Sequence, residues 1–158
     1  MRRNDRQITD PQQIHAFIAA EQILRIAFID GEEAYIVPVN YGYVCECGKS
    51  FFYFHGAQEG RKYQLSLSAP QVGFEIDGKY HSLPHTQACK FSATFQSVIG
   101  TGQVQIVTNE DEKKKGLDAI MAQVSGRSDW TYSQQAMEKV AVFRLEVKTM
   151  SCKGRLID

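Results

Sequence analysis

Apolar and polar residues alternate along much of the chain, and this alternation predicts a protein built mainly of β-strands. The clearest strand is the last, about residues 140–150, in which apolar side chains alternate with charged ones. A strand of this kind packs one face and leaves the other in water. Further strands are predicted at residues 24–29, 34–44, 50–54, 72–76 and 88–107.

Three segments follow helical spacing instead. The first begins at the capping pair Asp10 and Pro11, and the last begins at Asn109 and stops at Gly126. The middle one is short and ends before Pro70. The predicted helices therefore cover residues 10–22, 60–69 and 109–126.

The order of these elements excludes a doubly wound sheet, which needs a helix between most of its strands. Tight turns join the first three strands instead, and Asp30-Gly31 is a strong turn signal. Residues 78–86, which include His81 and His85, are predicted to be a loop. The order of the elements therefore predicts a mainly β (α+β) fold, in which an antiparallel barrel is flanked by helices. The 158 residues contain no repeat or linker, so residues 1–158 are predicted to form a single domain.

The charge balance and the hydropathy of the sequence limit the classes of binding partner that we expect. Eighteen basic residues balance eighteen acidic ones, so no overall positive field favours nucleic acid or anionic lipid. No apolar run is long enough to span a membrane. Residues 1–6 are basic but lead into polar residues rather than an apolar signal segment, so we expect a cytoplasmic protein with neither a membrane nor a nucleic-acid partner.

Four cysteines raise the question of a metal site. Cys45 and Cys47 are separated by one residue, whereas structural zinc sites usually leave two to four residues between such ligands. A second pair is missing, although His55, His81 and His85 could in principle complete a site. We interpret the cysteines as reduced thiols, with the first two at a hairpin tip, and predict no metal.

The most informative stretch is residues 53–62. An apolar strand ends in His55-Gly56-Ala57, and Arg61 and Lys62 then open a helix. The N-terminus of a helix presents free N–H groups and a partial positive charge, so two cations in its first turn favour a phosphate or another compact anion. The alternative is an ordinary turn at Gly60 followed by two solvated basic residues.

Several motifs in this order resemble the pyridoxamine 5′-phosphate oxidase-like flavoproteins, and the branch they resemble most is that of the nitroimidazole-resistance (Nim-type) proteins. Each motif alone is weak, but their order and spacing are specific, and the resemblance extends from about Met1 to Met150. The motifs lie at residues 1–8, 37–43, 52–57, 60–62 and 97–102.

The resemblance implies a split β-barrel that binds FMN at the interface of a homodimer. By this analogy Arg61 and Lys62 hold the phosphate and the 55–57 turn assists them. Trp130, close to the binding cleft, could come from the partner subunit. The implied cofactor-binding residues are Pro38, Val39, Asn40, Tyr41, His55, Gly56, Ala57, Arg61, Lys62, Ser97, Val98, Gly100 and Trp130.

Two residues of the turn carry open questions. Gly56 stands where relatives often have Ser, so a hydroxyl contact to the phosphate is lost and affinity is expected to be lower. His55 has four readings: contact with the cofactor, acid–base catalysis, haem ligation, or a hydrogen bond that closes the strand end.

The function implied is that of an FMN-dependent oxidoreductase, nitroreductase-like, acting on a small molecule with NAD(P)H as a candidate electron donor. The flavin carries such chemistry, and the sequence accordingly contains no catalytic triad or nucleophile elbow. The substrate would enter near Trp130 and the 81–85 loop. The alternatives are a non-enzymatic module that binds flavin or haem, and a pyridoxamine phosphate oxidase proper.

Overall fold

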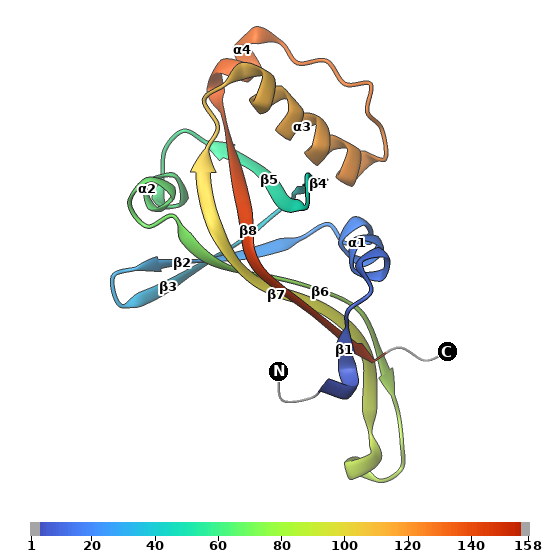
Figure 1. Cartoon of the computed structure of the whole chain (residues 1–158). Coiled ribbons are helices and arrows are strands. Elements are labelled where there is room, and N and C mark those ends of the chain that lie inside the picture. The colour runs from blue at the N-terminus through green and yellow to red at the C-terminus, as the bar shows by residue number, and fades with distance from the viewer. Residues whose placement is uncertain (1–3, 156–158) are drawn as a thin grey trace.

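The structure, a computed structural model, describes residues 4–155 and is dominated by one antiparallel sheet (Figure 1). Met1–Arg3, the start of the N-terminal motif, lie outside the described residues. Within the described part, eight strands are present: β1 (Gln7–Ile8), β2 (Leu24–Asp30), β3 (Glu33–Val39), β4 (Gly42–Glu46), β5 (Lys49–Ala57), β6 (Gln71–Leu83), β7 (Ser92–Ile106) and β8 (Val140–Arg155).

The strands follow the order β3-β2-β6-β7-β8-β5-β4, and β1 pairs with β8 beside this path. All of their pairings are antiparallel. The path ends at β3 on one side and at β4 on the other, so the sheet curls without closing. The predicted mainly β, split-barrel architecture with flanking helices is therefore confirmed.

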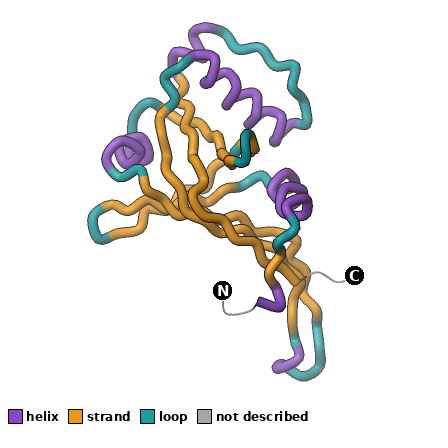
Figure 2. The backbone as a smooth tube through the Cα atoms, in the orientation of Figure 1, coloured by secondary structure: helices purple, strands orange, loops and turns teal. Residues whose placement is uncertain are grey.

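Helices lie around the sheet and make up the purple segments of Figure 2. None of those in the described part is long and apolar enough to cross a membrane. The predicted helical starts at Pro11, Arg61 and Glu110 are confirmed, whereas α4 falls in a stretch for which no helix was predicted. The α-helices are α1 (Pro11–Ala20), α2 (Arg61–Ser68), α3 (Glu110–Ser125) and α4 (Gln134–Lys139); short 3₁₀ turns occupy Asn4–Arg6 and Ala88–Lys90.

The two faces of the sheet pack differently. The inner face carries the main core, with Phe52 and Phe54 of β5 among its fully buried side chains. On the outer face α3 covers β4 and β5 and encloses a second cluster around Tyr53 and Val142. The outer face of β8, predicted to be wet, is thus dry at Val142, because a helix distant in sequence covers it.

The predicted loop at residues 78–86 is wrong. Strand β6 continues to Leu83, and His81 pairs with Thr94 of β7 after a shift in register. The two strands form a long hairpin that extends beyond the rest of the sheet (Figure 1). His85 does lie in the connecting loop. The segment predicted as one strand at 34–44 is also divided, since pairing stops at Asn40 and Tyr41.

Candidate functional site

Helix α2 begins directly after strand β5, and its N-terminus lacks a side-chain cap. Asp10, Asn109 and Ser133 cap the other α-helices of the described chain by accepting a backbone N–H. Gly60 has no side chain to do this, and its φ of 93° favours glycine. The N–H groups of the first turn of α2 are therefore open to an anion.

Lys62 lies in that first turn with its ammonium group partly withdrawn from water. Its Nζ donates a hydrogen bond of 2.9 Å to the carbonyl of His55. The same atom lies 5.5 Å from the centre of the Phe54 ring and 5.2 Å from that of Phe143. Burial lowers the pKa of Lys62 below its ordinary value of 10.5. An ammonium carries three N–H donors, so a ligand can still be bound by the others.

Gly56 provides the room for this lysine. A Cβ atom built at position 56 would lie 2.6 Å from Nζ and 3.0 Å from Cε of Lys62. The family resemblance implied only the loss of a serine hydroxyl here. The structure adds a steric role, because any larger residue would displace the ammonium group.

His55 enters the site through its backbone. Alternation along β5 sends Gly56 to the inner face with Phe54 and sends the His55 ring to the outer face. The ring reaches solvent. Its pKa is lowered mainly by partial desolvation and, to a smaller extent, by the positive charge of Lys62. A largely neutral ring at pH 7 follows. Ala57 ends the strand, exposed and paired with Val140.

Arg61, the first residue of α2, has carboxylate partners. Its Nε donates to Oδ2 of Asp30 at 2.6 Å, and its Nη2 to Oε2 of Glu33 at 3.3 Å. The guanidinium also lies 4.7 Å from the centre of the Tyr35 ring. These contacts raise the pKa of Arg61, chiefly through the hydrogen bond to Asp30. We call the start of α2 with Arg61 and Lys62 the α2 anion site.

The implied cofactor-binding residues 38–41 lie at the edge of the sheet. Pro38 pairs with Arg25, and Val39 with Leu24. Pro38 is exposed on the edge strand β3, where a proline costs no ladder hydrogen bond.

The next two residues, Asn40 and Tyr41, differ in burial. Asn40 is exposed and its Nδ2 donates to the carbonyl of Gln22 at 3.1 Å. Tyr41 is fully buried, and its hydroxyl donates to the carbonyl of Ile18 at 2.6 Å. Burial raises the pKa of Tyr41. Its side chain supports the core and α1, which leaves only backbone groups to face a ligand.

The predicted residues of β7 are not brought to the α2 anion site within one chain. Val98 is fully buried and belongs to the main core. Ser97 pairs with Asp77 and Lys153, and its Oγ is buried without a hydrogen-bond partner in the described chain. The end of α2 meets β7 near Val104, where the Val104 N–H donates to Pro70. At about 3.3 Å per residue, Ser97 lies roughly 23 Å further along the strand.

The contacts of Gly100 and Trp130 likewise involve residues other than those around Lys62. Gly100 is buried between Phe74 and the backbone of Thr149. Trp130 follows α3, where its Nε1 donates to Ser125 at 3.2 Å and Arg127 stacks 4.5 Å from the ring centre. One chain thus brings His55, Gly56, Arg61 and Lys62 together and leaves Ser97, Val98, Gly100 and Trp130 apart from them.

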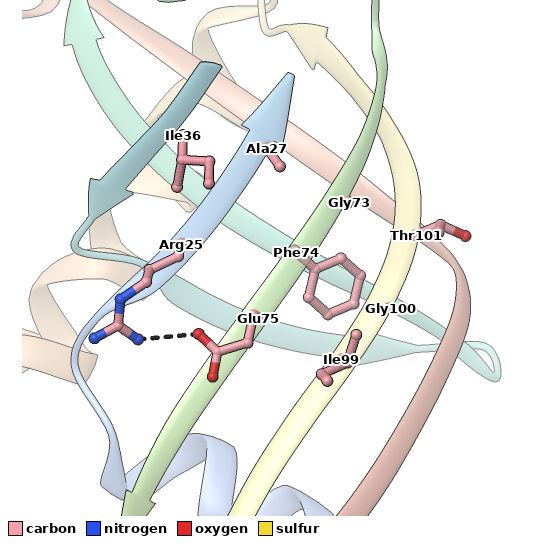
Figure 3. Close-up of a pocket in the computed structure, with 9 residues that line it drawn as sticks. All are labelled: Arg25, Ala27, Ile36, Gly73, Phe74, Glu75, Ile99, Gly100 and Thr101. Atoms are coloured by element: carbon pink, nitrogen blue, oxygen red, sulfur yellow. Dashed lines mark hydrogen bonds and ion pairs between the residues drawn. The ribbon is translucent and has the colours of Figure 1, made fainter. Parts of the chain in front are cut away.

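Sequence reasoning missed a groove of about 460 Å³ on the open outer face of the sheet (Figure 3). Its floor is low because Ala27 and Gly73 are paired neighbours. Ile36 and Ile99 rise on either side and are 61% and 48% exposed. The lining residues are Arg25, Ala27, Ile36, Gly73, Phe74, Glu75, Ile99, Gly100 and Thr101.

The outer-face groove combines apolar surface with one ion pair. Arg25 binds Glu75 at 3.0 Å and also contacts Asp77. Exposed isoleucines gathered on one face are typical of a binding surface. Ile36 stands on β3 and Ile99 on β7, one residue on each strand, so the sequence could not show that they share a surface until the strand order was known.

Comparison with known proteins adds a family and a set of similar folds. A family model described as Pyridoxamine 5′-phosphate oxidase matches residues 10–154. No curated protein sequence matches the chain. A candidate 5-nitroimidazole antibiotic resistance protein from Bacteroides thetaiotaomicron is 26% identical, with a TM-score of 0.81 over 94% of this chain and 86% of that one.

Two further solved structures are similar in fold. The flavocytochrome Anf3 from Azotobacter vinelandii is 18% identical, with a TM-score of 0.81, and the match covers 99% of this chain and 72% of that one. An FAD and heme binding protein from Mycobacterium smegmatis is 14% identical, with a TM-score of 0.80, and the match covers 94% and 73%.

Proposed function

Because the chain belongs to the pyridoxamine 5′-phosphate oxidase family, we propose that it binds FMN with the flavin phosphate at the α2 anion site. The observation that carries this proposal is the uncapped start of α2 beside a partly desolvated lysine. Backbone N–H groups and Lys62 suit a phosphate in charge and in hydrogen bonding. Gly56 supports the fit, since its missing side chain is what lets the ammonium group lie there.

The flavin ring needs flat apolar surface and a few backbone hydrogen bonds. Pro38 and Asn40 offer exposed backbone at the end of β3. Ile36, two residues before Pro38, lines the outer-face groove and extends the apolar surface beside it. These surfaces support a ring bound along the edge of β3.

A homodimer is part of the proposal. Ser97 and Trp130 are implied cofactor contacts, yet their contacts within the chain lie away from Lys62. A second copy can bring such residues to the α2 anion site of the first. The exposed apolar groove on the outer face is the surface that supports this association.

We infer oxidoreductase activity on a small molecule, in the cytoplasm, with NAD(P)H as electron donor. A bound flavin supplies hydride and electron transfer, while the protein positions the ring and excludes water. Of this chain's residues, Lys62 and the first turn of α2 would hold the phosphate. His55 would fix Lys62 through its carbonyl.

A second candidate is a module that binds flavin or haem without catalysis. Two similar structures, a flavocytochrome and an FAD and heme binding protein, favour it. His55 is the residue of this site that could ligate haem iron, since its ring reaches solvent and its lowered pKa favours the neutral form.

The test is the absorbance spectrum of the purified protein, followed by mass spectrometry of what it releases on denaturation. The proposal predicts flavin bands and a released mass equal to that of FMN. Anaerobic NAD(P)H should then bleach the flavin bands. An intense Soret band would favour haem, and bound flavin that no donor reduces would favour the non-enzymatic module. Protein that stays colourless in excess FMN would contradict flavin binding in either form.

A further inference from the structure

The two adjacent cations of α2 differ in their partners: Lys62 has no carboxylate partner in the described chain, whereas Arg61 has two. Lys62 is bound to a neutral carbonyl, and its charge remains for a ligand. Arg61 is already paired with Asp30 at 2.6 Å and with Glu33 at 3.3 Å. Two carboxylates outweigh one guanidinium, so the cluster of Arg61, Asp30 and Glu33 is net negative before any ligand arrives.

Both carboxylates belong to one structural unit. Asp30 ends β2, Glu33 begins β3, and the two residues pair across the tight turn that joins the strands. Tyr35 of the same hairpin stacks under the guanidinium. Three residues of the β2–β3 hairpin therefore contact the side chain of Arg61, the first residue of α2. We call Asp30 and Glu33 the carboxylate clasp.

A phosphate at the start of α2 must share Arg61 with this clasp. Phosphate oxygens and carboxylate oxygens compete for the same N–H donors of a guanidinium. Glu33 is the weaker partner, with a side chain 77% exposed, and Asp30 is 39% exposed. Since exposed ion pairs contribute little stability, a phosphate can displace them at a modest cost.

We propose that Asp30 and Glu33 set how strongly the site prefers a phosphorylated flavin over the same flavin without its phosphate. The clasp lowers this preference by holding Arg61 away from the phosphate, and Lys62 with the helix N-terminus carries most of the recognition. This inference rests on the proposed flavin site. It predicts that FMN binding loosens the hairpin tip from α2.

The test compares Asp30→Asn/Glu33→Gln with the wild type by titrating each with FMN and with riboflavin. The amides keep the size of the side chains and remove their charge. We expect the Kd for FMN to fall about three- to tenfold, as the loss of two exposed ion pairs implies, while that for riboflavin stays unchanged. Glu46→Gln, which removes the exposed Lys115 ion pair elsewhere, is the matched control and should change neither Kd.

Arg61→Ala provides the mechanistic control. If competition for Arg61 is the cause, the gain from the amide variant disappears in the Arg61→Ala background. Should the double amide variant fail to fold, Glu33→Gln alone should give a smaller shift in the same direction.

The outcomes separate the two proposals. Unchanged or weaker FMN binding in the amide variants would overturn the clasp and leave the flavin site standing, as would a gain that persists without Arg61. A wild type that binds neither flavin would overturn the proposed function and the clasp together.

Discussion

A Cβ atom at position 56 would lie 2.6 Å from the ammonium nitrogen of Lys62, so the glycine and the lysine form one unit. We predict that Gly56→Ser weakens FMN binding, even though the new hydroxyl could contact a phosphate, because the side chain displaces Nζ from the His55 carbonyl. Titration with FMN measures the effect. In a Lys62→Met background the same substitution should cost less, and an equal cost in both backgrounds would contradict the steric coupling.

The cations of α2 should contribute unequally. Lys62→Ala removes a partly desolvated charge, a loss that costs about 2 kcal/mol or more, and should weaken FMN binding about 30-fold. Arg61→Ala should weaken it less than about fivefold, because an exposed and already paired guanidinium contributes little. Circular dichroism should show both variants folded. A larger loss from Arg61→Ala would reverse the assignment.

The lowered pKa of Lys62 has a consequence for stability. Between that pKa and the ordinary value of 10.5, the unfolded chain binds a proton that the folded chain has released. The contribution of Lys62 to the free energy of unfolding therefore increases as the pH rises through this window. Lys62→Met should remove this gain. Denaturant unfolding of both proteins from neutral to alkaline pH measures it, and parallel curves would speak against a desolvated Lys62.

The two-residue turn between β4 and β5, which contains Cys47, can be stabilised by a substitution. Cys47 has a φ of 50°, and Gly48 follows it with a φ of 75°. A residue other than glycine in the left-handed region is strained, and Asn-Gly is the pair that such two-residue turns prefer. Cys47→Asn should raise the free energy of unfolding by about 0.5 kcal/mol. Cys45→Ser, on the neighbouring strand, serves as the control and should leave stability and flavin binding unchanged.

The outer-face groove is predicted to lie between two copies. Ile99→Glu places a charge on this surface beside Glu75 and should convert a dimer into a monomer of 17.9 kDa. Leu67→Glu is a matched control, because Leu67 is 60% exposed and lies on α2 away from the groove. Light scattering reads the mass. A wild type that is monomeric with flavin bound would rule out the shared site.

Local signals in the sequence predicted the elements that local physics determines. The start of α2 at Arg61, the Asn109 cap and the Asp30-Gly31 turn depend on neighbouring residues, and all three are present in the structure. The distal part of β6 was missed because the glycine, histidine and proline residues of the 78–86 stretch are typical of loops. It is extended because it pairs with β7, and such pairing leaves no mark on one strand alone.

The candidate site divides in the same way. The grouping of His55, Gly56 and Lys62 follows from a strand running directly into a helix, and the motif predicted it. The pairing of Arg61 with Asp30 and Glu33 joins residues about thirty positions apart and was not foreseen. Nor could the sequence reveal that Ser97 lies far along β7 from α2, because that depends on which strands are neighbours.

The central claim is that the start of α2, with Lys62, binds the phosphate of a flavin. Titration of the apoprotein and of Lys62→Met with FMN and riboflavin, followed by flavin fluorescence, tests it most directly. We predict that the wild type binds FMN more tightly than riboflavin and that Lys62→Met loses most of this difference while binding riboflavin as before. Equal affinity of the wild type for the two flavins would contradict the claim.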